Sequence, residues 1–325
     1  MSFDLYLASY DDAKIIDYAY SENFPLLYSQ INNRGYILKH FEAQDANKTS
    51  GKLLIDSGAH SAHTKGIKLD LEEYMGFVND NINKLSLYVQ VDKIPGVYLK
   101  PKTAKDFLEA PQLSWENYLY MREKSADYNK LIPVFHQGED FKWLENMCNY
   151  EFSNGEHIPY IGLSPRGDVS LTAKYDFCAK CFSIIQSSKN PKVKTHAFGA
   201  TSLSMLERLP FTSADSATWV LVSAFGQVWI PTGITGESID DTVGVKLGVS
   251  KENIDHPTAT QTYWEQSPEI KKKLDDYFES IGTNIEKLSE SHSERSLASA
   301  KFCQNWARTY QYKGQKTFAS TMNLF

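Results

Sequence analysis

Three aspartates stand at the ends of strand-like runs, where carboxylates could do chemistry. Asp56, Asp92 and Asp215 each close a short run of apolar residues, and two histidines and a glutamine stand in equivalent positions. A charged side chain at the end of a buried run is costly unless it is used or paired, although one aspartate alone often only caps the next helix. The three together predict a functional site. The other residues at these run ends include Ser57, Gly58, His136, Gln137, Gly162, Leu163 and His196.

Three carboxylates suit two kinds of chemistry. One is a site for a hard metal ion, which takes oxygen ligands. The other is work at a glycosidic carbon, in which one carboxylate attacks and a second moves a proton. A metal site usually shows acidic pairs close in sequence or combinations of histidine and carboxylate, and His136 and His196 keep that interpretation open.

Eight apolar runs would position these residues. Runs rich in β-branched and aromatic residues are typical of strands buried on both faces of a parallel sheet. Helix-like stretches separate them, among them 69–85, 139–150, 174–187 and one that Ser114 is expected to cap. This pattern predicts a (β/α)8 barrel, with its site at the carboxyl ends of the strands. The alternative is an open doubly wound sheet, but no glycine-rich dinucleotide fingerprint follows the first run. The runs are residues 3–9, 52–58, 87–95, 131–138, 160–165, 193–199, 211–215 and 219–225.

The pattern changes after Pro231. We expect a barrel over 1–232 and, over 233–325, a loop and helical extension packed on it, with helices at 267–288 and 294–310. The tail after residue 294 has basic and aromatic residues but no Asp or Glu, which suits a nucleic-acid backbone and its bases. A C-terminal helix that docks its aromatic side chains on the barrel explains the same pattern, and both interpretations can hold. The basic residues are Arg295, Lys301, Arg308, Lys313 and Lys316.

Composition excludes several classes of protein. The chain has 325 residues, of which 42% are hydrophobic and 23% charged, and its net charge is −6. These values exclude intrinsic disorder as the main state and a uniformly basic nucleic-acid coat. The four cysteines are too few and too scattered for a disulfide framework. There is no apolar run of membrane-spanning length and no signal-peptide pattern, so a reduced, cytoplasmic protein is expected, without a membrane partner.

The segment 56–61, DSGAHS, resembles a motif of the tRNA-guanine transglycosylase superfamily, and in particular of its phage- and genomic-island-type branch that inserts 7-deazaguanine bases into DNA. The resemblance covers roughly residues 50–230, and its segments occur in the same order at barrel-like spacing. Each segment alone is a weak signal. The other matching segments are 91–96, 114–118, 133–140, 160–165, 196–201 and 213–219.

The resemblance implies a TIM-like barrel enzyme and a role for each matching residue. Asp215 matches the nucleophile that attacks C1′ of the target nucleoside, and Asp56 matches the general acid and base. Asp92 matches the aspartate that recognises the base edge. The remaining matches concern the bound base: Gln137 contacts it, backbone groups of Gly162 and Leu163 meet it, and Ser57, Gly58, His136 and His196 line its site.

The chain also departs from the family pattern. His60 stands where the family usually has Phe, beside the bound base, which leaves the choice of base open. The zinc cluster of the tRNA enzymes is absent, and Cys178 and Cys181 form a CxxC pair in a helix-like stretch, where two core cysteines are the simpler interpretation. We therefore expect neither metal nor cofactor, and a tRNA-specific role loses support.

The leading hypothesis is an enzyme that exchanges guanine in DNA for a free 7-deazaguanine base, with the target base flipped or single-stranded. A second hypothesis is a DNA glycosylase that leaves an abasic site, an activity suited to defence against phage with modified DNA. A tRNA-directed exchange and a catalytically idle barrel that binds nucleic acid are the remaining alternatives.

Overall fold

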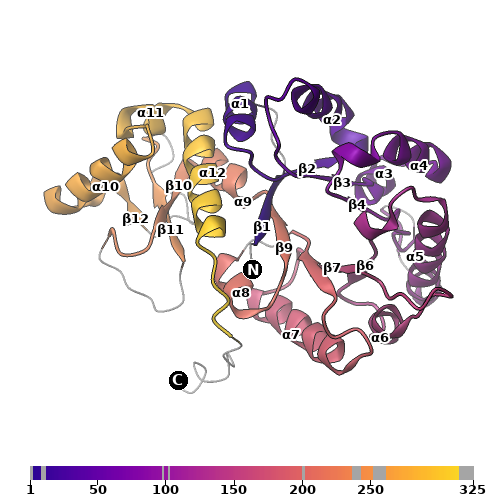
Figure 1. Ribbon diagram of the computed structural model, residues 1–325. Coiled ribbons are helices and arrows are strands. Elements are labelled where there is room, and N and C mark those ends of the chain that lie inside the picture. The colour runs from indigo at the N-terminus through magenta and orange to yellow at the C-terminus, as the bar shows by residue number, and fades with distance from the viewer. Residues whose placement is uncertain are drawn as a thin grey trace, which may run out of the picture.

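The computed structural model describes residues 3–8, 12–96, 99–101, 103–199, 202–235, 243–251 and 261–314. Parallel strands lie at the middle of a ring of helices, and a smaller unit lies to one side (Figure 1). The parallel sheet runs in the order β5-β4-β3-β2-β1-β9-β8-β7-β6. Its strands are β1 Asp4–Ala8, β2 Leu26–Ser29, β3 Leu53–Asp56, β4 Leu87–Val89, β5 Leu131–Ile132, β6 Val134–His136, β7 Tyr160–Ser164, β8 Lys194–Ala197 and β9 Ser213–Ser216.

Pro133 joins the two ends of this sheet. β5 and β6 stand at opposite ends of the strand order, but only Pro133 separates them in the chain. Proline has no N–H group to donate, so the ladder is interrupted there. The carbonyl of Pro133 still accepts from Gly162 N at 2.8 Å, and Ile132 O accepts from Gln90 N at 3.0 Å. The pair therefore acts as one strand, and the sheet is a TIM-like barrel rather than an open doubly wound sheet.

One of the eight strand predictions is wrong, and one strand of the barrel lies outside all eight predicted runs. Residues 219–225 form most of a helix, α9 Thr218–Ala224, instead of a strand. The buried residues of this helix are Trp219, Val222 and Ser223, which are spaced as on one face of a helix. The sequence does not show this spacing, because the residues between them are also apolar or small. The missing eighth strand is β2, a four-residue segment after Pro25 that is too short to stand out from the sequence.

Helices cover the outside of the barrel. The cap of α5 is Thr103, whose side chain and that of Asp106 form a capping box. Ser114, expected as a cap, lies inside that helix instead, where its hydroxyl donates to Ala110 O. The helices are α1 Ala13–Ser21, α2 Gln30–Asp45, α3 Ala59–Lys65, α4 Leu71–Asp80, η1 Ile82–Lys84, α5 Ala104–Lys124, η2 Tyr128–Lys130, α6 Lys142–Asn149, α7 Leu171–Ser187 and α8 Leu203–Arg208.

The C-terminal unit contains a sheet as well as the expected helices. β10 Gln227–Pro231 pairs antiparallel with β11 Gly244–Gly248, which pairs parallel with β12 Gln261–Thr262. Because β10 belongs to this sheet and to a separate apolar core, the unit begins before the expected boundary at 232. The stretch 267–288 forms two helices instead of one. The helices of the unit are η3 Tyr263–Glu265, α10 Pro268–Ser280, α11 Ile285–Glu290 and α12 His292–Arg308.

Helix α12 joins this unit to the barrel, and it lies between them in Figure 1. Gln304 Nε2 donates to Leu5 O at 2.9 Å. Phe3, at the start of β1, stacks on Tyr310 with ring centroids 4.4 Å apart and meets Trp306 edge-on at 5.5 Å. The end of α12 and the residues after it therefore cover the amino-terminal end of β1.

One buried histidine makes stability sensitive to acid. His40 on α2 is fully buried, and its ring nitrogens have no hydrogen-bond partner among the described residues. Burial lowers the pKa of His40 from 6.5 to about 4. The unfolded chain therefore takes up this proton as the pH falls through 6.5, while the folded chain resists until about pH 4. We expect His40 to cost about 3 kcal/mol of stability between pH 7 and pH 4.

Urea unfolding at pH 7 and pH 4 measures this loss. The variant His40→Leu should lose less stability than the wild type over that interval. His157→Asn is the control, because the ring of His157 contacts Tyr150 O in a half-buried position. An equal acid loss in wild type and His40→Leu would contradict the prediction.

Candidate active site

The three aspartates meet at the carboxyl end of the barrel. Asp56 is the last residue of β3, Asp215 lies in β9, and Asp92 follows β4 by three residues. The charges of Asp92 and Asp215 both act on the carboxyl group of Asp56, so the three side chains converge from separate parts of the ring. The side chains of Asp92 and Asp215 are only 11% and 12% exposed.

Asp56 holds its proton unusually well. Burial, followed by the charge of Asp92 and then that of Asp215, raises the pKa of Asp56 from 3.8 to about 7, although the N–H of Gly58 donates to its carboxylate at 3.1 Å. Gly58 has φ +79°, and a Cβ there would lie 2.6 Å from the side chain of Ile31. The turn that supports Asp56 therefore requires glycine. Asp56 can act as an acid near neutral pH.

Asp215 is held by two donors. The N–H of Gly199 donates to Asp215 Oδ1 at 2.9 Å, and His196 Nε2 lies 3.3 Å from the same oxygen. Gly199 has φ +60°, a left-handed turn directly after β8 that aims its N–H at the carboxylate. Among the described residues, Asp215 Oδ2 has no hydrogen-bond partner. One oxygen is therefore fixed, and the other is available to a substrate.

Asp92 belongs to a charged cluster with His136 and Glu139. His136 Nε2 lies 3.4 Å from Asp92 Oδ2, and His136 Nδ1 lies 3.2 Å from Glu139 Oε1. Burial alone would lower the pKa of His136, but the two carboxylates outweigh it and raise that pKa to about 10. Gln90 Nε2 donates to Asp92 Oδ1. His136 is thus a cation at neutral pH that lies beside the side-chain oxygens of Asp92 and Glu139.

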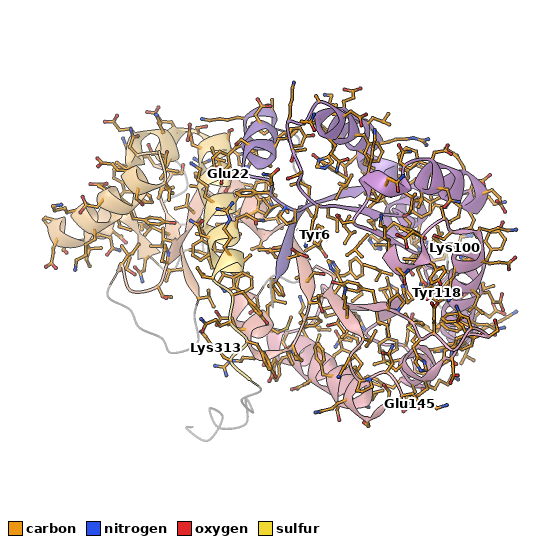
Figure 2. All side chains as sticks on the ribbon, viewed as in Figure 1. Tyr6, Glu22, Lys100, Tyr118, Glu145 and Lys313 are labelled. Atoms are coloured by element: carbon orange, nitrogen blue, oxygen red, sulfur yellow. The ribbon has the colours of Figure 1, made fainter. Side chains whose placement is uncertain are left out.

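Packed side chains fill the barrel below the aspartates. Tyr6 lies at the middle of the ring of strands (Figure 2) and packs with Leu54, Val89 and Ile132. A Cβ on Gly162 would come within 2.3 Å of the ring of Phe198, so glycine at this position lets that ring lie across β7. The site therefore has an apolar floor, which suits a flat aromatic ligand.

The structure does not support two of the expected base contacts. Gly162 N donates to Pro133 O, and Leu163 O accepts from Phe198 N at 2.9 Å, so these backbone groups are used within the sheet. The Leu163 side chain belongs to the core between strands and helices. Gln137 uses both ends of its amide on the scaffold, with Nε2 donating to Ala173 O and Oε1 accepting from Arg166 N.

The structure places the other expected site residues around Asp56. Ser57 is buried behind it, and Gly58 supports its carboxylate. His60 is exposed in the first turn of α3, which follows β3 directly. A contact between His60 and a bound base stays a prediction.

The described basic residues of the tail are engaged within the protein. Arg295 is buried, with its guanidinium donating to Ser223 O and Leu288 O at 2.9 Å each, so this prediction is wrong. Lys301 donates to a backbone carbonyl and lies over a tyrosine ring. Arg308 pairs with Glu22 at 3.2 Å and Lys313 with Glu207 at 2.5 Å.

Those two ion pairs lie at the end of the barrel opposite the aspartates. Glu22, labelled in Figure 2 with Lys313, follows α1 and precedes β2, and Glu207 precedes β9. Helix α12 docks at this end of the barrel because its aromatic residues Phe302 and Trp306 are buried against the rest of the molecule. Lys316 lies outside the described residues.

Several neighbours of the site escaped the sequence analysis. They are Gln90 and Glu139, which contact the Asp92 cluster, and Tyr160 and Ser213, which lie beneath Asp215. Side chains on one face of a strand are two residues apart. Gln90 stands two residues before Asp92, and Ser213 stands two residues before Asp215. A search for polar residues at this spacing therefore finds Gln90 and Ser213.

The cysteines are buried and unpaired: Cys148, Cys178, Cys181 and Cys303. Over the described ranges, no group of three or more His, Cys, Asp and Glu residues is placed to hold a metal ion. In the same part of the chain, no helix is both long and apolar enough to cross a membrane.

Comparisons with known proteins identify no family for the chain. No protein-family model matches the chain, and no curated protein matches it. One solved structure that it resembles is a protein of Aquifex aeolicus VF5, described as "Structural study of Project ID from Aquifex aeolicus VF5". The TM-score is 0.38 and the identity 9%, with 67% of this chain and 84% of that chain covered.

Proposed function

We propose that this protein exchanges a base of DNA at the N-glycosidic bond, replacing guanine by a 7-deazaguanine base. The observation that carries the proposal is the pair Asp56 and Asp215. They lie at one end of the barrel in unlike environments, one crowded by carboxylates and the other held by two donors. Unlike environments let two carboxylates take the two protonation states that a double displacement needs.

The first displacement opens the glycosidic bond. Asp215 Oδ2 attacks C1′, and the bond between C1′ and the base nitrogen breaks as Asp56 donates its proton to the leaving base. The product is an ester between Asp215 and the sugar. In the second displacement, the incoming base gives its N–H proton to the Asp56 carboxylate and bonds to C1′, which frees Asp215. Two inversions give net retention at C1′.

Asp92 would select the base. A carboxylate accepts hydrogen bonds and does not donate them, and the cation of His136 lies 3.4 Å from Asp92 Oδ2. An edge with adjacent N–H donors, as in guanine, suits such an acceptor. The base must leave the duplex stack to reach the site, so a flipped or single-stranded target is required.

A base-release assay on DNA tests the proposal. We expect repeated turnover of guanine release only when a free 7-deazaguanine is present, with the new base found in the DNA; without it, at most one guanine per enzyme is released, as the ester forms. Repeated release without an acceptor, leaving alkali-labile sites, would make the protein a glycosylase whose ester is resolved by water. Binding of DNA with no release under either condition would contradict both reactions, and tRNA in place of DNA tests the remaining alternative.

The loop that follows Asp92 offers a better phosphate-binding surface than the tail. Residues 93–105 contain four lysines and no Asp or Glu. Of these, Lys93 and Lys100 are exposed and form no ion pair with a described residue, while Lys105 pairs with Glu109. Leu99 is 88% exposed at φ +61°. This basic loop lies at the same end of the barrel as the aspartates.

Charge reversal at this loop should weaken binding to DNA. We expect the double variant Lys93→Glu and Lys100→Glu to bind DNA more weakly. A plot of the logarithm of the DNA association constant against the logarithm of the salt concentration should also be less steep, by about 2, since each phosphate contact contributes roughly 0.9 to the slope. Fluorescence anisotropy between 50 and 200 mM salt measures both. Lys189→Glu with Lys192→Glu is the control, because these exposed lysines precede β8 at the other end of the barrel. Equal effects of the two double variants would contradict a specific role of the loop.

A further inference from the structure

Three buried groups form a chain of hydrogen bonds that ends at Asp215. Tyr160 Oη lies 2.7 Å from Ser213 Oγ, which lies 2.6 Å from His196 Nδ1, and His196 Nε2 lies 3.3 Å from Asp215 Oδ1. The chain crosses the inside of the barrel from β7 through β9 to β8. His196 and Ser213 are fully buried, and Tyr160 is 6% exposed.

The chemistry of the groups sets the direction of this chain. A carboxylate only accepts, so His196 must carry its proton on Nε2 to donate to Asp215. In the neutral ring Nδ1 is then an acceptor, and the hydroxyl of Ser213 donates to it. The Ser213 oxygen in turn accepts from Tyr160, whose pKa is raised by burial, so that it keeps its proton. For a neutral His196 ring, only one direction satisfies all three contacts.

We propose that Tyr160, Ser213 and His196 are positioning residues, which fix the Nε2–H tautomer of His196 and through it the orientation of Asp215. The His196 ring is also held sideways, with Tyr6 at 5.9 Å and Phe198 at 4.4 Å, both edge-on. With Oδ1 bound by His196 and Gly199, Oδ2 is the oxygen presented to C1′. This role rests on the proposed function, but the tautomer itself does not.

The loss of the Ser213 hydroxyl separates positioning from substrate binding. Ser213 lies below Asp215 inside the barrel and is fully buried, so Ser213→Ala should leave KM for DNA unchanged. Without the donor to Nδ1 the ring can take the other tautomer, which turns a lone pair toward Asp215. We expect kcat to fall about 10- to 100-fold, as for other supporting contacts. Ser213→Thr keeps the hydroxyl and should restore most of the activity.

Thr195→Val is the matched control. Thr195 is also buried on β8, beside His196, but its hydroxyl has no partner among the described residues. The variant should keep the kcat of the wild type. A comparable fall in kcat in this variant would show that any change in these strands disturbs the site, and would overturn the positioning role.

Nitrogen-15 NMR of the histidine rings tests the tautomer without any reaction. In the wild type we expect the His196 signals, assigned by their loss in His196→Gln, to show Nε2 protonated and Nδ1 bare, and in Ser213→Ala to show a mixture of tautomers. Protonation on Nδ1 in the wild type would overturn the proposal. An inactive wild type with the expected tautomer would instead contradict only the proposed base exchange.

Discussion

Asp215→Asn is expected to abolish base exchange while leaving the fold and DNA binding intact. The amide is nearly isosteric, and its oxygen can still accept from Gly199 N–H, which lies 2.9 Å from Asp215 Oδ1. It is not a nucleophile, so the ester with C1′ cannot form. Loss of an attacking group usually lowers kcat by about 10⁴-fold or more. Guanine release and the covalent protein–DNA adduct, seen by mass spectrometry, should both disappear.

Two further variants make this result interpretable. Asp140→Asn removes an exposed carboxylate that precedes α6 at the same end of the barrel, where it pairs with Lys142 at 3.5 Å, and it should keep the activity of the wild type. Asp215→Ala excludes reversion by deamidation of the asparagine. An adduct that survives in Asp215→Ala would place the nucleophile elsewhere.

Asp56→Asn is expected to block release of an unactivated base and to remove a pH dependence. The proton that leaves with the base sits on Asp56, whose pKa is raised to about 7 by burial and by Asp92 and Asp215. In the wild type, single-turnover release should therefore be constant below pH 7 and fall about tenfold per pH unit above it. In Asp56→Asn the rate should be about 10²- to 10⁴-fold lower and independent of pH over this range.

A change of leaving group tests the acid role directly. 7-Methylguanine in DNA carries a positive charge and leaves without taking up a proton. Asp56→Asn should therefore release 7-methylguanine at nearly the rate of the wild type. If release of guanine by the wild type instead rises with pH through 7, or if the methylated base is affected as strongly as guanine, Asp56 is not the proton donor.

The aspartates of the site could be predicted from the sequence because each ends an apolar run, and a barrel brings such ends together. Their partners could not, because they depend on contacts between distant strands. The pKa of Asp56 near 7 needs Asp92 and Asp215, and the cation at His136 needs Asp92 and Glu139 together. The spacing of these residues along the chain does not predict how close their side chains come in the folded protein.

The errors in the fold have similar causes. The four residues of β2 are too few to show a strand pattern in the sequence, and the sequence of α9 resembles a strand because every face of that helix is apolar or small. The tail after residue 294 suits both nucleic acid and a helix that docks on the barrel, and its charge alone does not tell at which end of a barrel such a helix docks. The burial of Arg295 and the pairing of Arg308 with Glu22 decided that.

The contact of α12 with β1 constrains how the nascent chain can fold. β1 is translated well before its neighbour β9, which begins at Ser213, and Gln304, which donates to Leu5 O, lies 299 residues beyond Leu5 in the chain. At 5–20 residues per second, synthesis of that interval takes roughly 15 to 60 s. Until β9 has been translated the growing barrel has unpaired sheet edges, which invite association with other chains, and until α12 has been translated the amino-terminal end of β1 is uncovered. Such a chain is expected to depend on chaperones until α12 has been translated.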